Sequence, residues 1–225
     1  PCALVSGTQL VHKYREGAWQ PYAKDELVDV LVQDVLNTPP YVRISRMIRD
    51  ISATDILVGN KHTNLRQMVE QELAAEDVAN RVQAIRFREI KQQQVRAAEL
   101  TLQDFTYTTA VSDEHFLQWV TADNKIAGFC RLSLPHWDKL TSGVCDVTAN
   151  ELLVQPGQAM IRELHVYGQA LSLGSEGMSA QHQGLGQKLL AKASSIAAHA
   201  GYTSLNVISS IGTRAYYRAQ GFTDA

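Results

Sequence analysis

Two glycines separated by a single leucine stand at the expected start of a helix, where they could hold a phosphate group. The run is Gln181-His182-Gln183-Gly184-Leu185-Gly186, and it opens a helix expected over 184–200. Glycine lets the backbone approach a ligand without interference from a Cβ atom. The first turn of a helix has free N–H groups and a positive dipole end, so together these features form a cradle for a pyrophosphate. A plain turn explains the same glycines, and the GxGxxG pattern is absent.

The elements around this turn fill the second half of the chain. Apolar periodicity in the helix over 184–200 defines a buried stripe, and Gly201 ends this helix. A strand over 160–167 precedes the turn, whereas a strand over 205–208 and a short helix over 213–220 follow it. Thr213 is expected as the N-cap of that short helix. Earlier strands are predicted over 102–111, 116–121 and 126–134, the last two joined as a hairpin.

The first half of the chain is expected to be the end of an α/β unit. A helix over 28–36 is stopped by Pro39-Pro40, and a strand over 41–51 and a helix over 64–75 follow. A basic stretch over 81–96 without clear period is the expected linker. Its cations could contact phosphates, although charge alone favours a solvated surface. They are Arg81, Arg86, Arg88, Lys91 and Arg96.

Composition bounds the class of protein. The chain has 225 residues, of which 45% are hydrophobic and 20% charged, so a disordered tail, a fibre and a small disulfide scaffold are excluded. We find neither a bilayer-spanning apolar run nor a signal peptide. The three cysteines are far apart, form no metal or cluster motif and suit reduced thiols in the cytoplasm. Because the chain starts without Met, we expect a fragment that lacks its N-terminal part.

Several motifs carry a resemblance to a known family. The order strand, Q-x-x-G-x-G, helix, strand and helix, ending in Tyr217-Arg218-Ala219-Gln220-Gly221-Phe222, resembles the GCN5-related N-acetyltransferase fold, which binds acetyl-CoA. Three runs more specifically resemble the acetyltransferase-like domain of the Elongator catalytic subunit family: RELHVYG over 162–168, QHQG over 181–184 and GTRAYYR over 212–218. The runs over 49–51 and 64–66 resemble the tail of its radical S-adenosylmethionine domain.

The resemblance implies an α/β fold with two lobes. Residues 1–80 would be the C-terminal end of a radical S-adenosylmethionine barrel, 81–96 a basic linker and 97–225 an acetyl-CoA-binding acetyltransferase-like domain. The implied activity is C5 carboxymethylation of the tRNA wobble uridine (U34), with acetyl-CoA and a radical derived from S-adenosylmethionine. S-adenosylmethionine and a [4Fe-4S] cluster would belong to the missing part. The five linker cations would contact the anticodon arm of tRNA between the two domains.

The resemblance also implies roles for individual residues. Tyr217 would lie by the thioester sulfur, where a tyrosine hydroxyl, with an ordinary pKa of about 10, can donate a proton to the leaving thiolate. Tyr216 would be a packed aromatic. The strand edge beside the pantetheine and acetyl group would be Glu163, Leu164, His165 and Val166. The residues that hold the pyrophosphate would be Gln181, Gln183, Gly184, Leu185, Gly186 and Gln187.

Some roles stay open at this point. Glu163 could act as a general base or be a surface carboxylate, and strand alternation places it with His165 on the face opposite Leu164 and Val166. A dimer or Elongator-type partner subunits are also open, whereas no membrane contact is expected. The alternative functions are a protein lysine N-acetyltransferase and a non-catalytic CoA-binding module.

One departure from the family concerns a metal. Val82, Ala84 and Phe87 stand where family members carry a cysteine cluster that binds zinc in the linker. Apolar side chains cannot ligate zinc. We therefore predict that this protein has no linker zinc.

Overall fold

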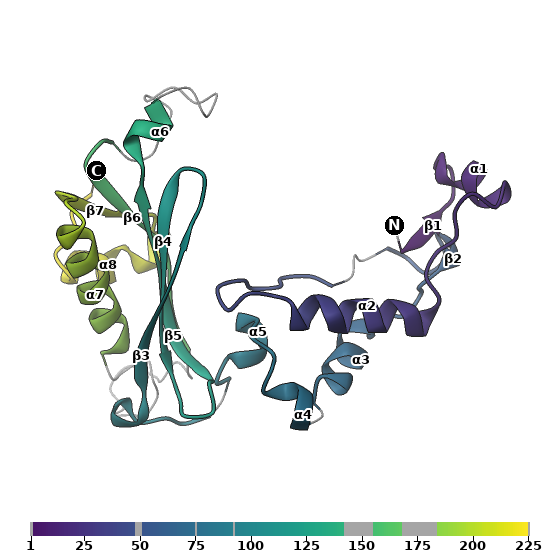
Figure 1. Cartoon of the computed structure of the whole chain (residues 1–225), viewed down its shortest axis with the longest axis horizontal. Coiled ribbons are helices and arrows are strands. Elements are labelled where there is room, and N and C mark those ends of the chain that lie inside the picture. The colour runs from purple at the N-terminus through teal and green to yellow at the C-terminus, as the bar shows by residue number, and fades with distance from the viewer. Residues whose placement is uncertain are drawn as a thin grey trace. The chain divides into compact units, whose positions relative to one another are not determined.

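The computed structural model of the chain divides into two compact units, 1–88 and 89–225, and each is described here by itself (Figure 1). The structure describes residues 2–47, 51–74, 76–91, 93–141, 155–167 and 184–224. Within these ranges, no helix is long and apolar enough to cross a membrane.

The first unit is mainly helical, with one small sheet. Its two strands pair in antiparallel fashion, Ala3 opposite Gly59. The helices pack their apolar faces together, with Leu27, Val35 and Val69 buried between them. The elements are β1 (Ala3–Val5), α1 (Leu10–Arg15), α2 (Lys24–Leu36), β2 (Ile56–Gly59), α3 (Leu65–Glu72), α4 (Glu76–Ala79) and α5 (Ile85–Arg88).

The helices expected over 28–36 and 64–75 are confirmed as α2 and α3, but the strand expected over 41–51 is wrong for the described residues of that range. Residues 41–47 contain no strand. Ile44 and Met47 pack against the helical core, and the carbonyl of Val42 accepts a hydrogen bond from Ile85 N at 3.1 Å. The alternating pattern therefore reflects burial of one side of an extended segment that joins no sheet.

The basic stretch over 81–96 is also more ordered than an exposed linker. Val82, Ala84 and Ile85 are buried, and the last of these begins α5. Ile90 N donates to the carbonyl of Ile126, which fixes the start of the second unit against its own sheet. Apolar residues interleaved with the cations thus anchor both ends of this segment.

The second unit contains a five-stranded mixed sheet in the order β3-β4-β5-β6-β7, in which only the β6–β7 pair is parallel. The expected strands, the hairpin and both helices are confirmed. The missed elements are short helices. The elements are η1 (Ala97–Glu99), β3 (Thr101–Thr108), β4 (Ser112–Val120), β5 (Ile126–Pro135), α6 (Trp137–Thr141), β6 (Gln158–Val166), α7 (Leu185–His199), β7 (Ser204–Val207), η4 (Ile211–Thr213) and α8 (Arg214–Ala219).

Helix α7 covers one face of this sheet (Figure 1). The predicted stripe is confirmed: Leu185, Leu189, Ala193 and Ala197 are buried and Ile196 is partly buried. Leu117, Cys130, Leu132 and Ile161 meet this stripe from the sheet, so the core lies between α7 and strands β4 to β6. Burial of this apolar surface fixes the start of α7 relative to the end of β6.

The cap of α8 differs from its expectation. Thr213 does occupy the N-cap position, but its side chain makes no capping hydrogen bond. Its Oγ1 instead donates to the carbonyl of Ser210 at 3.1 Å. The hydroxyl therefore stabilises the preceding turn, η4, rather than the helix.

Candidate functional site

Strand β6 changes partners in the middle of its course. Its pairing with β7 runs from Gln158 to Ile161, which lies opposite Val207. The strand then continues to Val166 alongside β5, and among the described residues β7 does not follow it. The register against β5 shifts at the same point, so that Arg162 is an extra residue in β6. Such a bulge bends a strand and redirects its side chains.

The side chains of the β6 end alternate between the two faces, as predicted. Leu164 packs against the core under α7, and Val166 packs against the cluster that contains Leu185. Glu163 and His165 lie on the opposite face, where the ring of His165 stacks on Phe129 with centroids 5.7 Å apart. The edge predicted to line the pantetheine therefore joins the α7 core on one side and a polar face on the other.

Glu163 is held in ion pairs. Arg131 Nε donates to its Oε2 at 2.9 Å, and His165 Nδ1 lies 3.6 Å from Oε1. The interactions with His165 and Arg131 hold the pKa of Glu163 below its ordinary value, although partial burial opposes them. A general base works best with a pKa near the operating pH. A lowered pKa favours a surface carboxylate held in ion pairs over a general base, the two alternatives that the sequence left open for Glu163. Its catalytic role stays a prediction.

The expected phosphate cradle begins with a left-handed glycine. Gly184 has φ +68° with open space around it, a conformation that favours glycine, and it is the N-cap of α7. Gly186 in the first turn is buried, and a Cβ atom there would lie 2.6 Å from the hydroxyl of Tyr216. Gln187 is exposed, whereas Gln181 and Gln183 lie outside the described residues.

The two tyrosines of α8 differ in burial, and Tyr216 departs from its expectation. Tyr217 is the packed aromatic, with its ring 5.7 Å from that of Phe222, whereas Tyr216 is 40% exposed. The expectation for Tyr216 was wrong because the helix turns Tyr217 toward the α7 core. Burial, with contributions from Cys130 and Tyr216, raises the pKa of Tyr217 above its ordinary value. Its hydroxyl therefore stays protonated at neutral pH, as a proton donor requires.

The expected tRNA-contacting cations divide between the two units. Arg81, Lys91 and Arg96 are exposed, and Arg86 is partly buried. Arg96 pairs with the nearby Glu99 at 3.1 Å, an exposed contact of small energetic value. These four side chains remain open to an anionic ligand.

Arg88 requires a correction, because it is only 3% exposed. Its Nε donates to the carbonyl of Gln83 at 2.8 Å and its Nη2 to that of Pro40 at 3.0 Å. Burial lowers the pKa of Arg88 to about 10. Its guanidinium thus stabilises the fold of the first unit, and the expected phosphate contact is wrong in this structure.

The structure also adds residues that sequence reasoning missed. Glu114 is buried on the face of the sheet opposite α7, within reach of Arg162, and Arg131 holds Glu163 on the same face. The guanidinium of Arg131 lies 5.2 Å from the ring centroid of Phe116 and so packs as a cation–π contact. A carboxylate inside an otherwise buried strand, as in β4, is the signal that could have identified Glu114.

The positions expected to replace zinc ligands are apolar core positions. Val82 and Ala84 are buried, and Phe87 packs against the core of the first unit. In the part of the chain that the structure describes, no group of three or more His, Cys, Asp or Glu side chains could hold a metal ion. The absence of a linker zinc stays a prediction. The spacing of Cys2, Cys130 and Cys145 does not fit an iron–sulfur cluster either, so we derive no step through one.

In this mixed sheet, β6 diverges from its parallel neighbour β7, and helix α7 begins at a glycine close to the end of β6. This arrangement defines an acetyltransferase type of fold. The model of the acetyltransferase (GNAT) family matches residues 82–222, and the chain therefore belongs to this family. Residues 1–75 match the model of the Radical_SAM C-terminal domain. Both matches confirm the predicted α/β fold class.

Relatives make the assignment more specific. The chain is 37% identical to the "tRNA uridine(34) acetyltransferase" of Dehalococcoides mccartyi, over 99% of this chain and 47% of that protein. It is 30% identical to "Elongator complex protein 3" of Danio rerio, over 99% of this chain and 40% of that protein. These relatives confirm the resemblance to the Elongator catalytic subunit.

A solved structure agrees with these relatives. The Elp3 structure of Methanocaldococcus infernus, which has an N-terminal deletion, superposes with a TM-score of 0.81 at 27% identity, covering 100% of this chain and 52% of that chain. The chain thus spans about half the length of the relatives that it matches.

Proposed function

We propose that this chain binds acetyl-CoA and cleaves its thioester within an enzyme that carboxymethylates C5 of the tRNA wobble uridine. The observation that carries the proposal is the divergence of β6 from β7 next to the first turn of α7. A strand edge offers N–H and C=O groups to the amides of a pantetheine, and the start of a helix offers N–H groups to a diphosphate. The relatives named for uridine(34) acetylation support the choice of tRNA.

The proposed binding residues are those that the family resemblance implies. The edge from Glu163 to Val166 would bind the pantetheine and acetyl group, and Gly184 to Gln187, with Gln181 and Gln183, would bind the diphosphate. When water adds to the acyl carbon and the carbon–sulfur bond breaks, the sulfur would take the proton of the Tyr217 hydroxyl. The proton that the water loses would then restore that hydroxyl, so that a carboxylic acid and free CoA leave. The raised pKa of Tyr217 supports this role, because the hydroxyl keeps its proton until the thiolate forms.

S-adenosylmethionine would supply the radical that activates the acetyl methyl group in the complete enzyme. The residues described above only bind the thioester, orient it and donate a proton to the sulfur. A dimer, Elongator-type partner subunits and a cytoplasmic location stay predictions.

The RNA contact is proposed for the four cations that remain open, Arg81, Arg86, Lys91 and Arg96. Contacts from Arg and Lys to phosphates position an RNA without reading its sequence. The charge reversal Arg81→Glu should weaken tRNA binding. It should also make the slope of log affinity against log salt less steep, by the amount that about one phosphate contact contributes. An unchanged slope would remove this residue from the interface.

The decisive experiment incubates the full chain with acetyl-CoA, with and without tRNA, and quantifies free CoA by chromatography. Hydrolysis that tRNA stimulates, and that Tyr217→Phe slows through kcat more than through KM, is the expected result. Acetyl transfer to a lysine peptide in the absence of tRNA would indicate a protein acetyltransferase. Turnover in neither case, with acetyl-CoA bound, would indicate a non-catalytic module. Calorimetry that detects no acetyl-CoA binding would overturn the proposal.

A further inference from the structure

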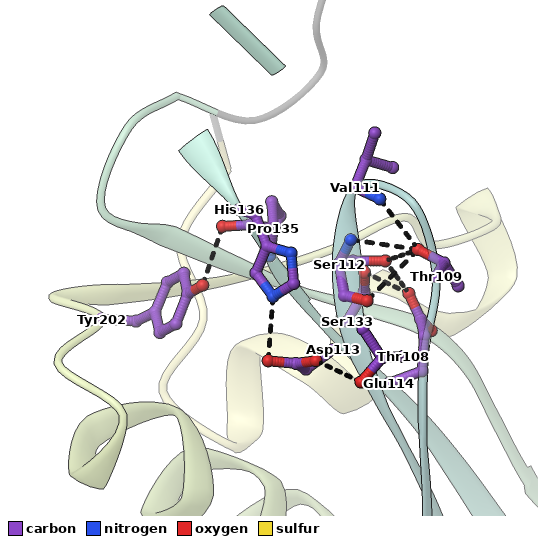
Figure 2. A network of polar contacts seen from close by, with 10 residues as sticks. All are labelled: Thr108, Thr109, Val111, Ser112, Asp113, Glu114, Ser133, Pro135, His136 and Tyr202. Carbon is purple, nitrogen blue, oxygen red and sulfur yellow. Dashed lines mark hydrogen bonds and ion pairs between the residues drawn. The ribbon is translucent and has the colours of Figure 1, made fainter. Parts of the chain in front are cut away.

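A buried carboxylate that the proposed chemistry does not use lies beside the bulge of β6. The side chain of Glu114, near the start of β4, is 3% exposed. It accepts hydrogen bonds from Ser112 Oγ at 2.8 Å and from Ser133 Oγ at 2.6 Å (Figure 2). Its second oxygen accepts from Arg162 Nη1 at 3.0 Å. Burying a carboxylate is costly unless it is paired and hydrogen-bonded, so both serine hydroxyls and the arginine are needed here.

Arg162 is the extra residue of the bulge. Ile161 lies opposite Leu132 and Glu163 lies opposite Arg131, which leaves no β5 partner for Arg162. As a result, two consecutive side chains lie on the same face of the sheet, because Arg162 reaches Glu114 and Glu163 reaches Arg131. An ordinary strand would place them on opposite faces.

The ion pair also marks the place where β6 leaves β7. Ile161 is the last β6 residue that pairs with β7, and Arg162 follows it directly. The Arg162 side chain is 54% exposed, so solvent exclusion does not hold it in place. The carboxylate of Glu114 holds the Arg162 side chain in place, because Glu114 is itself held by two hydroxyls on two different strands.

We propose that Glu114 is a positioning residue, which through Arg162 holds the bulge of β6 and so sets the position of the strand edge from Glu163 to Val166. The inference rests on the proposed function, because that edge is where the pantetheine and acetyl group would bind. Without the pair, the extra residue loses the contact that favours the bulge over regular pairing. The edge then moves relative to the start of α7.

The test uses the full chain with Glu114→Gln, Arg162→Gln and the double variant. The matched control is Asp113→Asn, the same carboxylate-to-amide change on the neighbouring residue of β4. Asp113 accepts from Thr108 Oγ1 at 2.7 Å and lies 2.9 Å from His136 Nε2, and neither of these two partners is a group that holds Glu114 (Figure 2). Circular dichroism establishes that each variant is folded, and Arg162→Gln changes an exposed side chain that the core does not need.

Two readouts separate positioning from general stability. Calorimetry should show acetyl-CoA binding weakened about tenfold in each single variant, which corresponds to about one lost hydrogen bond at the displaced edge. The double variant should bind no more weakly than either single variant, since both remove the same contact. KM for hydrolysis should rise with little change in kcat, and Asp113→Asn should leave both values near those of the parent chain.

Hydrogen exchange supplies the second readout without any ligand. The amides of residues 162–166 should exchange faster in Glu114→Gln and Arg162→Gln than in the parent or in Asp113→Asn. Parent-like exchange and affinity in both single variants would overturn the positioning role, as would equal losses in the control. If the parent chain binds no acetyl-CoA but the exchange pattern appears, the proposed function fails while the hold on the bulge stands.

Discussion

The approach of β5 to the end of β6 gives a prediction about Gly128. A Cβ atom at this position would lie 2.9 Å from the carbonyl oxygen of His165 and 3.3 Å from Val166 Cγ2. Both are in the strand edge that we assign to acetyl-CoA. Ordinary contacts of a Cβ atom begin at about 3.4 Å, so Gly128→Ala requires β6 to move by roughly half an ångström. The strand is tied nearby, because Tyr167 N donates to the carbonyl of Ala127 at 2.9 Å.

Overpacking in a closely packed core costs about 1–3 kcal/mol, and we expect Gly128→Ala in the upper part of that range because the opposing atom is backbone. Urea denaturation measures the loss. Calorimetry should also show weaker acetyl-CoA binding. Gly212→Ala is the control, because a Cβ atom there meets nothing within 4 Å and the backbone is not left-handed. If the urea denaturation midpoint of Gly128→Ala is as close to that of the parent chain as the midpoint of Gly212→Ala, the tight contact between the strands is refuted.

Three further predictions test other parts of the structure. Leu189→Ala removes a fully buried side chain under α7 and should destabilise the second unit by about 2–5 kcal/mol in urea denaturation. Cys130 is buried and its pKa is raised to about 12, so native iodoacetamide labelling at pH 8 should leave it unmodified in mass spectra while Cys2 reacts. Because the pKa of Glu163 is lowered in the folded chain, its stabilising contribution is present above the ordinary value of 4.5 and disappears as pH falls. On acidification, the free energy of unfolding should therefore fall less in Glu163→Gln than in the parent chain. An equal fall in both would contradict the ion pairs.

The second unit was largely predictable because its signals are local and agree with one another. Helical periodicity from Leu185 to Ala197 and the turn before Ile126 define elements whose apolar faces can only pack together. The family motifs added the class of fold. Periodicity alone would not give the parallel pairing of β6 with β7, which depends on contacts distant in sequence.

The first unit and the polar face were less predictable for a physical reason. Alternation around Val42 indicated one buried side, but it could not tell whether a neighbouring strand was present. The charge of Arg88 indicated exposure, whereas two backbone carbonyls make its burial tolerable. Glu114 and Arg162 are 48 residues apart, and only the folded sheet brings them together. Side chains whose partners lie far along the chain are therefore the ones that local patterns misplace.

The inserted residue of β6 makes the effect of a deletion depend on where in this strand it falls. Side chains of a strand change faces with every residue. Because Arg162 has no partner in β5, its deletion would restore regular pairing and leave the remainder of β6 in its present register. A deletion of Leu164 or His165 would instead invert the following side chains and direct Val166 away from Leu185. Engineered variants of this protein should therefore substitute residues 163–166 of β6 rather than delete them.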